Sequence, residues 1–412
     1  MAILHPTRTH TALLPRYVSR FRCIGSACTD NCCTGWTVTL DKKTFNAYRQ
    51  SRHPELQEVF GTSLRRQRSG ASDSFYGRIE MTEGEIACPI MRDGLCGVHK
   101  HMDESHLSHT CFTYPRVSAS LGGQVQQALQ LSCPEAARQA LLAPDAFDFV
   151  EDQITVRSAE VRRLDAGASV SPELLHDVRI FCLQLMRLEG VELWQRLALL
   201  GVFCEQLSQV GKAAGAAGIP ALLDEFTRLA ESGAMLDALG DLRPNHEDQA
   251  IVFATLWSGK EAPGRTARQR AVIDAVASNL GADPETGVAS IESLVAAYTR
   301  GVERLPQALA AAPHLLDHYV LNEMFLHLFP FDAADAYESY LQLVSRYGLL
   351  RLMLAAQCAA DAPLPGVDTL VETVQIFCRR FRHDQGFAKQ TNEALRNGGW
   401  DSLDKLYGFL RY

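Results

Sequence analysis

The sequence lacks a long apolar run, and this argues against a membrane-spanning segment. No stretch approaches about 18 uncharged apolar residues, since even the apolar run from Leu349 to Ala360 contains Arg351. The first residues also lack a basic segment followed by an apolar one, so we expect no secretory signal. These absences predict a cytoplasmic protein without a transmembrane segment. Peripheral contact with a membrane stays open, because it needs no spanning helix.

Two common cofactor-binding motifs are missing as well. No Gly-x-Gly-x-x-Gly follows a predicted strand, and no phosphate-binding loop ending in Gly-Lys-Ser/Thr occurs. The cysteine spacing typical of radical S-adenosylmethionine enzymes would require a cysteine at position 35, where the chain has Gly35. The sequence therefore gives no support for a Rossmann-type nucleotide pocket or for an ordinary radical enzyme of that class.

A concentrated positive charge is also lacking, which argues against a nucleic-acid partner. Residues 1–140 contain 16 Lys and Arg against 12 Asp and Glu, a net charge of +4. Since the whole chain carries −8, the remaining residues carry −12. An excess of this size is too small for a nucleic-acid-binding face, although it suits an anionic cofactor or an acidic protein partner.

Cysteine, by contrast, is abundant and unevenly distributed. Four of the twelve cysteines lie alone in apolar helical segments, and we expect them to be buried core side chains: Cys182, Cys204, Cys358 and Cys378. The other eight fall within the first 133 residues and need another explanation: Cys23, Cys28, Cys32, Cys33, Cys88, Cys96, Cys111 and Cys133.

The first 140 or so residues predict short, irregular elements. Trp36 to Asp41 alternates and is rich in β-formers, so it predicts a strand. Residues 116–133 predict a hairpin, because the Gly122-Gly123 pair supplies a tight turn between two stretches of period two. Residues 51–85, which hold Arg65, Arg66 and Arg68 beside a Ser- and Gly-rich stretch, predict an exposed loop.

From about residue 145 onward the apolar pattern becomes helical. Ser171-Pro172 is a favourable N-cap and first-turn pair for the first of these helices. The predicted helices span 172–189, 191–210, 221–239, 246–258, 266–279, 291–305, 313–328, 333–360 and 367–387. We therefore predict a mainly α protein, with a cysteine-rich metal-binding domain at 1–140 that has short β-strands and an all-helical domain at 145–412.

The eight N-terminal cysteines have the spacing of a metal site. Cys23, Cys28, Cys32 and Cys33 lie within eleven residues, close to Gly25 and Gly35, which let a loop fold back. Asp93-Gly94 predicts a turn that returns Cys96 toward Cys88, and the predicted hairpin brings Cys111 and Cys133 together. A cage of thiolates selects zinc, copper(I) or an iron-sulfur cluster over hard cations.

Several readings of these cysteines compete. Disulfides would need an oxidising compartment, and unrelated buried cysteines would need a larger core. Two structural zinc ions in all-thiolate sites are the strongest rival to an iron-sulfur cluster. Since adjacent cysteines do not easily bind one centre, Cys32 and Cys33 would serve different metals, or one would serve none. Four histidines between Cys96 and Cys111 offer nitrogen ligands, although solvated loop histidines are commoner: His99, His101, His106 and His109.

These motifs resemble one known family. The matching strings are Leu14-Pro-Arg-Tyr17, Cys23 to Trp36, Cys88-Pro89 to Cys96, Cys111 to Arg116 and Leu131 to Glu135, with a weaker likeness from Leu321 to Phe331. In them the chain is similar to the FliB-type flagellin lysine N-methylases, which share a zinc- or iron-chelating cysteine-rich region. The resemblance implies transfer of methyl groups from S-adenosylmethionine to ε-amino groups of flagellin surface lysines, with a cysteine-bound 4Fe-4S cluster.

The resemblance carries over all eight cysteines as metal-binding residues but does not indicate which four hold a cluster. It names no catalytic residue. We select Tyr114 and Arg116 as cofactor-binding residues, since a phenol can position an amine and a guanidinium can pair with a carboxylate; packing beside Pro115 and neutralising thiolates are their structural alternatives. The alternative function is a zinc- or iron-binding scaffold or regulatory protein without catalysis, and a redox protein or metallochaperone is a further rival.

Overall fold

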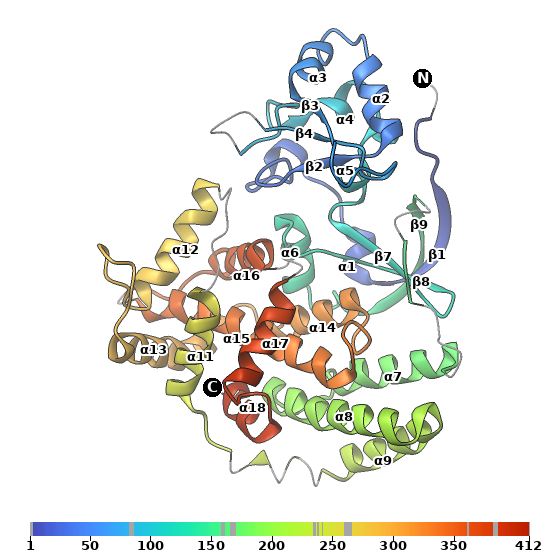
Figure 1. Cartoon of the computed structure of the whole chain (residues 1–412). Coiled ribbons are helices and arrows are strands. Elements are labelled where there is room, and N and C mark those ends of the chain that lie inside the picture. Colours follow the sequence, from blue (N-terminus) through green and yellow to red (C-terminus); the bar gives the residue numbers. More distant parts are fainter. Residues whose placement is uncertain are drawn as a thin grey trace.

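The computed structural model describes residues 3–81, 86–157, 161–164, 170–233, 236, 239–240, 242–258, 266–360, 362–381 and 386–411 of the 412-residue chain. Within these residues helices dominate, as the sequence predicts. Figure 1 shows a small upper lobe, built from N-terminal residues, above a larger body in which a β-sheet packs beside many helices.

The upper lobe is built on a three-stranded sheet in the order β2 (Val38–Leu40), β4 (Gly77–Ile79), β3 (Leu64–Arg66). Helices α2 (Lys42–Gln50) and α3 (Gln57–Ser63) accompany this sheet. The predicted strand at 36–41 is confirmed in a shorter form. The loop prediction for 51–85 is wrong in part: residues 67–76 form an exposed loop, but α3, β3 and β4 fall in the same stretch, and 82–85 lie outside the described residues.

A small hydrophobic cluster holds this lobe together. It includes Val38, Phe45, Tyr48, Phe60 and Ile79, which belong to α2, α3 and two strands. The Tyr48 and Phe60 rings stack with their centroids 4.5 Å apart. These apolar residues are scattered along the sequence rather than grouped in runs, so their common core was not visible before the fold.

The larger sheet has five strands in the order β10 (Val161–Leu164), β7 (Arg116–Leu121), β8 (Gln124–Leu129), β1 (Arg8–Pro15), β9 (Phe149–Val156). The predicted hairpin is confirmed as β7 and β8, with Gly122 and Gly123 at φ 55° and 92°. β9 and β10 were not predicted, and the sheet continues past residues 140–145. The division into two domains there stays a prediction.

Helices follow residue 170 largely as predicted. The helix predicted at 221–239 is shorter, because α9 ends at Ser232 before Gly233 at φ 71°, and residues 234, 235, 237 and 238 of the predicted span lie outside the described residues. Ser171 caps α7, its Oγ accepting the Leu174 N–H, and Thr266 caps α12 in the same way. The stretch predicted as one helix from 367 to 387 contains α16 and the start of α17, and 382–385 between them are not described. The helices of the body are α7 (Pro172–Leu185), α8 (Leu193–Ala213), α9 (Ile219–Ser232), α11 (His246–Ser258), α12 (Ala267–Asn279), α13 (Ile291–Leu309), α14 (Leu315–His327), α15 (Ala336–Ala359), α16 (Val367–Phe381), α17 (Phe387–Asn397) and α18 (Leu403–Leu410).

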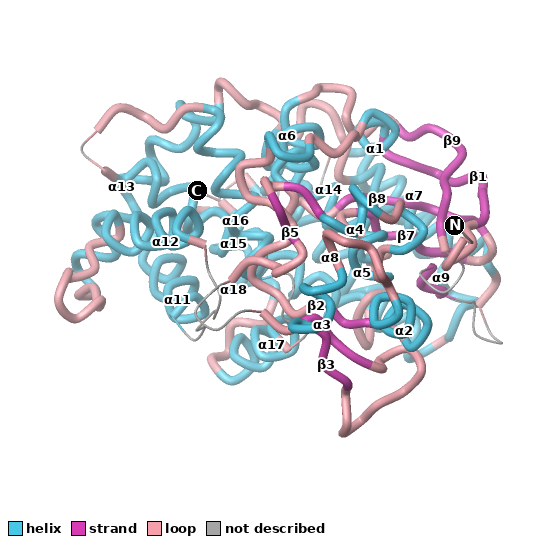
Figure 2. The backbone as a smooth tube through the Cα atoms, turned by 90° about the horizontal axis from the view of Figure 1, so that it is seen from above, coloured by secondary structure: helices cyan, strands magenta, loops and turns pink. Residues whose placement is uncertain are grey.

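One hydrophobic core joins the large sheet to the helices, running from Ala12 of β1 to Leu410 of α18. Seen from above, the sheet lies on one side of the molecule and α11 to α13 on the opposite side (Figure 2). The Tyr17 hydroxyl donates to Asn322 Oδ1 at 2.6 Å and so links α1 (Arg16–Arg20) to α14. The four isolated cysteines are confirmed as core residues, at 0–2% exposure. No helix in the described ranges is both long and apolar enough for a bilayer crossing, in line with the sequence.

Candidate metal centre

The first cysteine cluster lies in a loop that reverses direction twice. Gly25 and Gly35 have φ angles of 57° and 79°, values that residues with a side chain rarely adopt. The single 3-10 turn η1 (Gly25–Ala27) follows Cys23, and the Cys28 N–H donates to Gly25 O at 3.1 Å. The two glycines therefore do fold the loop back, as predicted from their positions.

Helix α16 fixes this loop from the far end of the chain. Asp30, between Cys28 and Cys32, is buried, and its Oδ2 lies 3.2 Å from Nη1 of Arg379. Arg379 also donates to the carbonyl oxygens of Asn31 and Thr34. Gln375, one turn earlier on α16, donates to Asp30 Oδ2 at 2.9 Å. A buried carboxylate paired in this way holds the loop to the helical body.

The second cysteine loop pairs with the first. Thr34 and Ala87 form an antiparallel bridge, and the Cys88 N–H donates to Cys33 O at 2.7 Å. Asp93 and Gly94, at φ 52° and 74°, form the predicted turn between β5 (Met91–Arg92) and β6 (Leu95–Cys96). The backbone thus places Cys33, Cys88 and Cys96 in one region.

The last two cysteines stand near helix starts on either side of the hairpin. Cys111 lies in α5 (His109–Thr113), and Cys133 is the N-cap of α6 (Pro134–Leu142). The Gln130 N–H donates to Pro115 O at 2.8 Å, which closes the base of the hairpin. Gln375 donates to Ser132 O as well as to Asp30, so one side chain ties Cys133 to the first loop.

The eight cysteines fall into two neighbourhoods. The inner set packs on or within the hydrophobic cluster of the upper lobe: Cys33, Cys88, Cys96 and Cys111. The outer set comprises Cys23, Cys28, Cys32 and Cys133. Cys23 and Cys133 interact with Arg116 of β7 and Cys32 with Arg379 of α16, and Cys32 also interacts with all four inner cysteines, so the two sets adjoin there. Within each set, a negative charge on one sulfur raises the pKa of its neighbours. Cys88 and Cys96 raise the pKa of Cys111 in this way, and Cys28 raises the pKa of Cys133. Cys32 interacts with members of both sets.

Burial raises the pKa of most of these thiols, and Cys32 is an exception. Burial raises the pKa of Cys88 to about 11 and the pKa of Cys111 and Cys133 to about 12. A hydrogen bond from the Cys33 thiol, aided by the Arg379 charge, lowers the pKa of Cys32 to about 7. The same hydrogen bond, followed by burial, raises the pKa of Cys33. Cys32 is therefore the member of the pair that ionises more readily.

The donor set fits a thiolate-bound metal. All eight cysteines are free thiols, so the disulfide reading is not supported by the fold. In the described part of the chain, no three of their sulfurs gather within 4.8 Å of one another. Four thiolates around one zinc ion would lie about 3.8 Å apart at a Zn–S distance of about 2.3 Å. The sulfurs as placed would therefore have to move closer together to hold one zinc ion between four of them.

The two predicted cofactor-binding residues occupy different surroundings. The Tyr114 hydroxyl lies 3.1 Å from Ser132 Oγ, its ring meets Trp36 edge-on at 5.0 Å, and burial raises its pKa. The Arg116 guanidinium lies over the Phe21 ring at 5.4 Å, and burial lowers its pKa. Arg116 also lines a cavity of about 430 Å³ together with Phe21. The binding roles of Tyr114 and Arg116 remain predictions, and of the two Arg116 is better placed.

Reasoning from the sequence missed Asp30, Gln375 and Arg379. Gln375 and Arg379 are four residues apart, so they share one face of α16, but amphipathic helices commonly have such pairs on a solvated face. Only the fold reveals that this face meets the cysteine loop. Long-range contacts of single polar residues leave no local pattern.

Comparison with known proteins supports a family relationship. Residues 179–409 match the family model described as the FliB lysine N-methylase C-terminal domain. The chain is 32% identical over 177 residues, 43% of its length, to lysine-N-methylases of Salmonella typhimurium and Salmonella choleraesuis, and this match spans 42% of the length of those relatives. It is 34% identical over 154 residues, 37% of its length, to the flagellar biosynthetic protein FliU of Salmonella muenchen, of which it covers 90%. No solved structure matches the chain at a significant level.

Proposed function

Because this chain belongs to the FliB lysine N-methylase family, we propose that it methylates the ε-amino groups of lysine side chains in a protein substrate. The observation that carries the proposal is the family match over residues 179–409, which covers the helical body. The relatives named lysine-N-methylase support the same activity. The cysteine strings of the N-terminal part support it independently, since they lie outside the matched range.

We further propose S-adenosylmethionine as the methyl donor and flagellin as the substrate. The donor follows from the resemblance of the cysteine strings to the family. The substrate is supported by the name of the relative FliU, a flagellar biosynthetic protein. Free lysine has a pKa of about 10.4, so methylation at neutral pH needs a site that deprotonates the amine. An apolar slot or nearby cationic groups would do so, and Arg116 would supply one such charge.

We assign the outer cysteine set to a 4Fe-4S cluster and the inner set to a second, structural metal. Two members of the outer set, Cys23 and Cys32, are exposed, whereas the inner set is packed against the hydrophobic cluster. Charge interaction places Arg116 near Cys23 and Cys133. With three of these four cysteines as ligands, the remaining iron would be open and would supply a binding point for the amino and carboxylate groups of S-adenosylmethionine. With all four as ligands, the cluster would supply only an electron for the sulfonium. In either role, Arg116 would pair with the donor's carboxylate.

A non-catalytic metal-binding scaffold is the second candidate function. The hydrogen bonds from Gln375 and Arg379 to the first cysteine loop favour it, because through them the helical body holds this loop in place. Such a protein would hold metal and bind a partner but transfer no methyl group.

Incubation of the anaerobically purified protein with flagellin and methyl-labelled S-adenosylmethionine separates the two functions. We expect label on flagellin lysines, and none in a flagellin-free control or with metal-depleted protein. An unlabelled flagellin despite full metal occupancy would leave the scaffold as the better account. An absorbance spectrum and metal analysis of the same sample test the cluster, since a colourless protein containing only zinc would remove it.

A further inference from the structure

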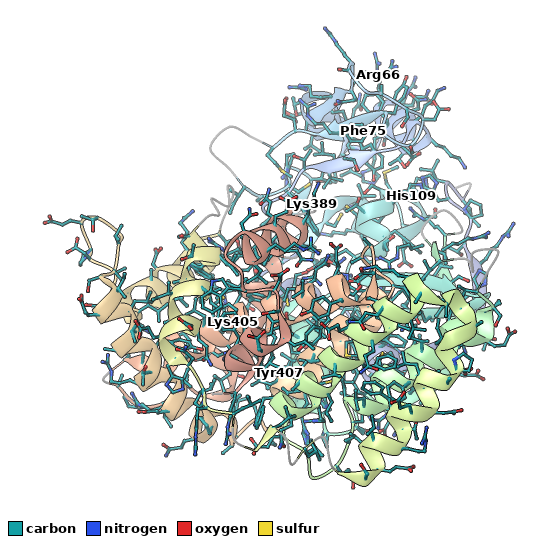
Figure 3. The ribbon with its side chains drawn as sticks, turned by 60° about the horizontal axis from the view of Figure 1, so that its bottom comes forward. Arg66, Phe75, His109, Lys389, Lys405 and Tyr407 are labelled. Carbon is teal, nitrogen blue, oxygen red and sulfur yellow. The ribbon has the colours of Figure 1, made fainter. Side chains whose placement is uncertain are left out.

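Two histidines and one aspartate from distant segments meet beneath α2. Their ligand atoms all lie within 4.8 Å of one another. Among the described residues, no other group of three or more His, Cys, Asp or Glu side chains is this compact. Nε2 of His5 lies 3.5 Å and Nε2 of His109 lies 3.8 Å from Oδ2 of Asp41. Figure 3 shows His109 at the base of the upper lobe, where the lobe meets the body.

The aspartate is held so that one oxygen faces both imidazoles. Asp41 is the N-cap of α2, and its Oδ1 accepts the backbone N–H groups of Lys43 and Thr44. The Thr44 hydroxyl donates to Oδ2, the oxygen nearest the histidines. Burial alone would raise the pKa of Asp41, but these bonds outweigh it and hold the pKa below its usual value. Such outer contacts orient a ligating carboxylate before the ion arrives.

The histidines suit metal binding in charge and access. Burial lowers the pKa of His5 to about 4, so its imidazole is neutral at pH 7, the form that ligates metals. The side chains of His5 and Asp41 are 9% and 10% exposed, whereas that of His109 is 36% exposed. Protein atoms therefore cover His5 and Asp41, whereas solvent reaches the His109 side chain. His5 Nε2 lies 2.7 Å from Thr44 Oγ1 and donates to it, since the Thr44 hydroxyl proton points to Asp41; a bound ion would take the place of the Nε2 proton.

Two positively charged side chains near the group would repel a bound cation, and one of them, Arg157, already has hydrogen-bond partners. Arg157 and Lys43 both act on His5. The Arg157 guanidinium donates to the carbonyl oxygens of Leu107 and Glu104 and lies over the Phe112 ring at 4.1 Å. The carbonyl oxygens and the ring partly offset the positive charge of Arg157. The negative Asp41 carboxylate would offset part of the charge of a bound ion.

We infer that His5, Asp41 and His109 bind one divalent first-row transition-metal ion, distinct from any metal held by the cysteines. Two imidazoles and one carboxylate form the donor set of catalytic zinc sites and of non-haem iron(II) sites with open positions. Donors around such an ion lie roughly 3.0 to 3.4 Å apart at bond lengths of about 2.1 Å. The observed separations from Asp41, 3.5 and 3.8 Å, need only small side-chain movements to reach this range, and the two histidine nitrogens, which lie within 4.8 Å of each other, have to approach further.

One of the three proposed ligands lies beside the cavity that Arg116 lines. His5 belongs to the wall of the same 430 Å³ cavity. Asp41 and His109 do not line this cavity, so the proposed ion site adjoins the cavity through His5 alone. The proposal does not depend on the methylation activity, and its test uses metal content rather than activity.

Metal analysis of the full chain tests the inference directly. The protein is incubated anaerobically with Zn²⁺ or, in a parallel sample, with Fe²⁺, then desalted and analysed by mass spectrometry. We expect His109→Gln and Asp41→Asn to retain one metal equivalent less than the wild type, with unchanged absorbance from any cysteine-bound iron. Asparagine preserves the N-cap of α2, and the circular dichroism of both variants checks their folding. The matched control is His99→Gln, on the same segment but exposed.

Equilibrium dialysis against Zn²⁺ gives the size of the effect. Loss of one ligand should weaken binding at least about 100-fold, since loss of an outer contact alone costs about 10- to 100-fold. His99→Gln should bind as the wild type does. Equal metal content and equal affinity in the wild type, His109→Gln and Asp41→Asn would overturn the proposal and leave a hydrogen-bonded N-cap cluster. Loss of cysteine-bound iron from the variants, with no other loss, would overturn it equally.

Discussion

Asp30 and Arg379 are 349 positions apart, yet Oδ2 of the aspartate lies 3.2 Å from Nη1 of the arginine. Both side chains are largely withdrawn from solvent, at 2% and 12% exposure. The contact joins the first cysteine loop to helix α16 and thus the predicted metal centre to the part of the chain that the family model matches. The helical body therefore determines the shape of the cysteine loop.

Arg379→Gln should destabilise the protein strongly. Removal of one partner leaves the Asp30 carboxylate buried without its ion pair, which typically costs about 3 to 5 kcal/mol. Chemical denaturation gives the change in the free energy of unfolding, and metal analysis should show reduced occupancy of the outer cysteine set. Lys389→Gln on α17 is the control, since Lys389 is 84% exposed and should change stability by less than about 0.5 kcal/mol. Equal stability of the two variants would refute a structural role for the ion pair.

Serine substitutions should separate the two cysteine sets. Cys28→Ser in the outer set should remove the iron-dependent absorbance and the methyl transfer together, because one cluster ligand is lost. Cys96→Ser in the inner set should remove a different metal equivalent and lower the melting temperature, with the absorbance retained. Cys182→Ala, in the core, should leave metal content unchanged. If Cys28→Ser and Cys96→Ser lose the same metal, there is one centre and the division into sets is wrong.

Arg116→Gln should weaken binding of S-adenosylmethionine without unfolding the protein. A hydrogen bond to a charged group contributes about 1.5 to 3 kcal/mol, which corresponds to a roughly 10- to 150-fold rise in Kd. Isothermal titration of the metal-loaded protein measures it. Arg22→Gln is the matched control, because Arg22 lines the same cavity but donates to the carbonyl oxygens of Ser19 and Phe21. Unchanged affinity in Arg116→Gln would mean that another group binds the carboxylate.

His318 should make stability depend on pH. Burial lowers its pKa to about 4, and its Nδ1 lies 2.8 Å from Ala140 O, between α14 and α6. Its imidazole stays neutral in the folded chain but gains a proton below pH 6.5 in the unfolded chain. The stabilisation is therefore complete above pH 6.5 and is lost as pH falls toward 4, by up to about 3 kcal/mol.

The measurement is the free energy of unfolding between pH 7 and pH 4 for the wild type and His318→Gln. The wild-type curve should fall more steeply, and His99→Gln, at an exposed histidine, should follow the wild type. Parallel curves for the wild type and His318→Gln would show that His318 does not titrate with unfolding.

Local patterns were sufficient for much of this fold. The Gly122-Gly123 turn, the Asp93-Gly94 turn and the Ser171 cap were all predicted, because each depends on residues adjacent in sequence. Strand β9 was missed: it pairs along its length with β1, and its exposed acidic residues, such as Glu151, give no apolar alternation. A strand that is stabilised by pairing with a distant segment cannot be predicted from its own residues alone.

The candidate site was predictable as a list of cysteines but not as an arrangement. The spacing pointed to metal-binding thiols, and the adjacency of Cys32 and Cys33 suggested that the two serve different metals or that one of them serves none. The separation into an inner and an outer set required the bridge between Thr34 and Ala87, and the role of Gln375 required α16 to be in place. His5 and Asp41 were missed, because nothing in sequence connects them to His109.

The most direct test of the account is tandem mass spectrometry of flagellin after reaction with metal-loaded protein and donor bearing a ¹³C-labelled methyl group. The account predicts heavy methyl groups on ε-nitrogens of surface lysines, in amounts that increase with time and are strongly reduced with Arg116→Gln. Flagellin that stays unmodified, while the protein retains its full iron and binds the donor, would contradict the claim that this chain is a lysine methylase.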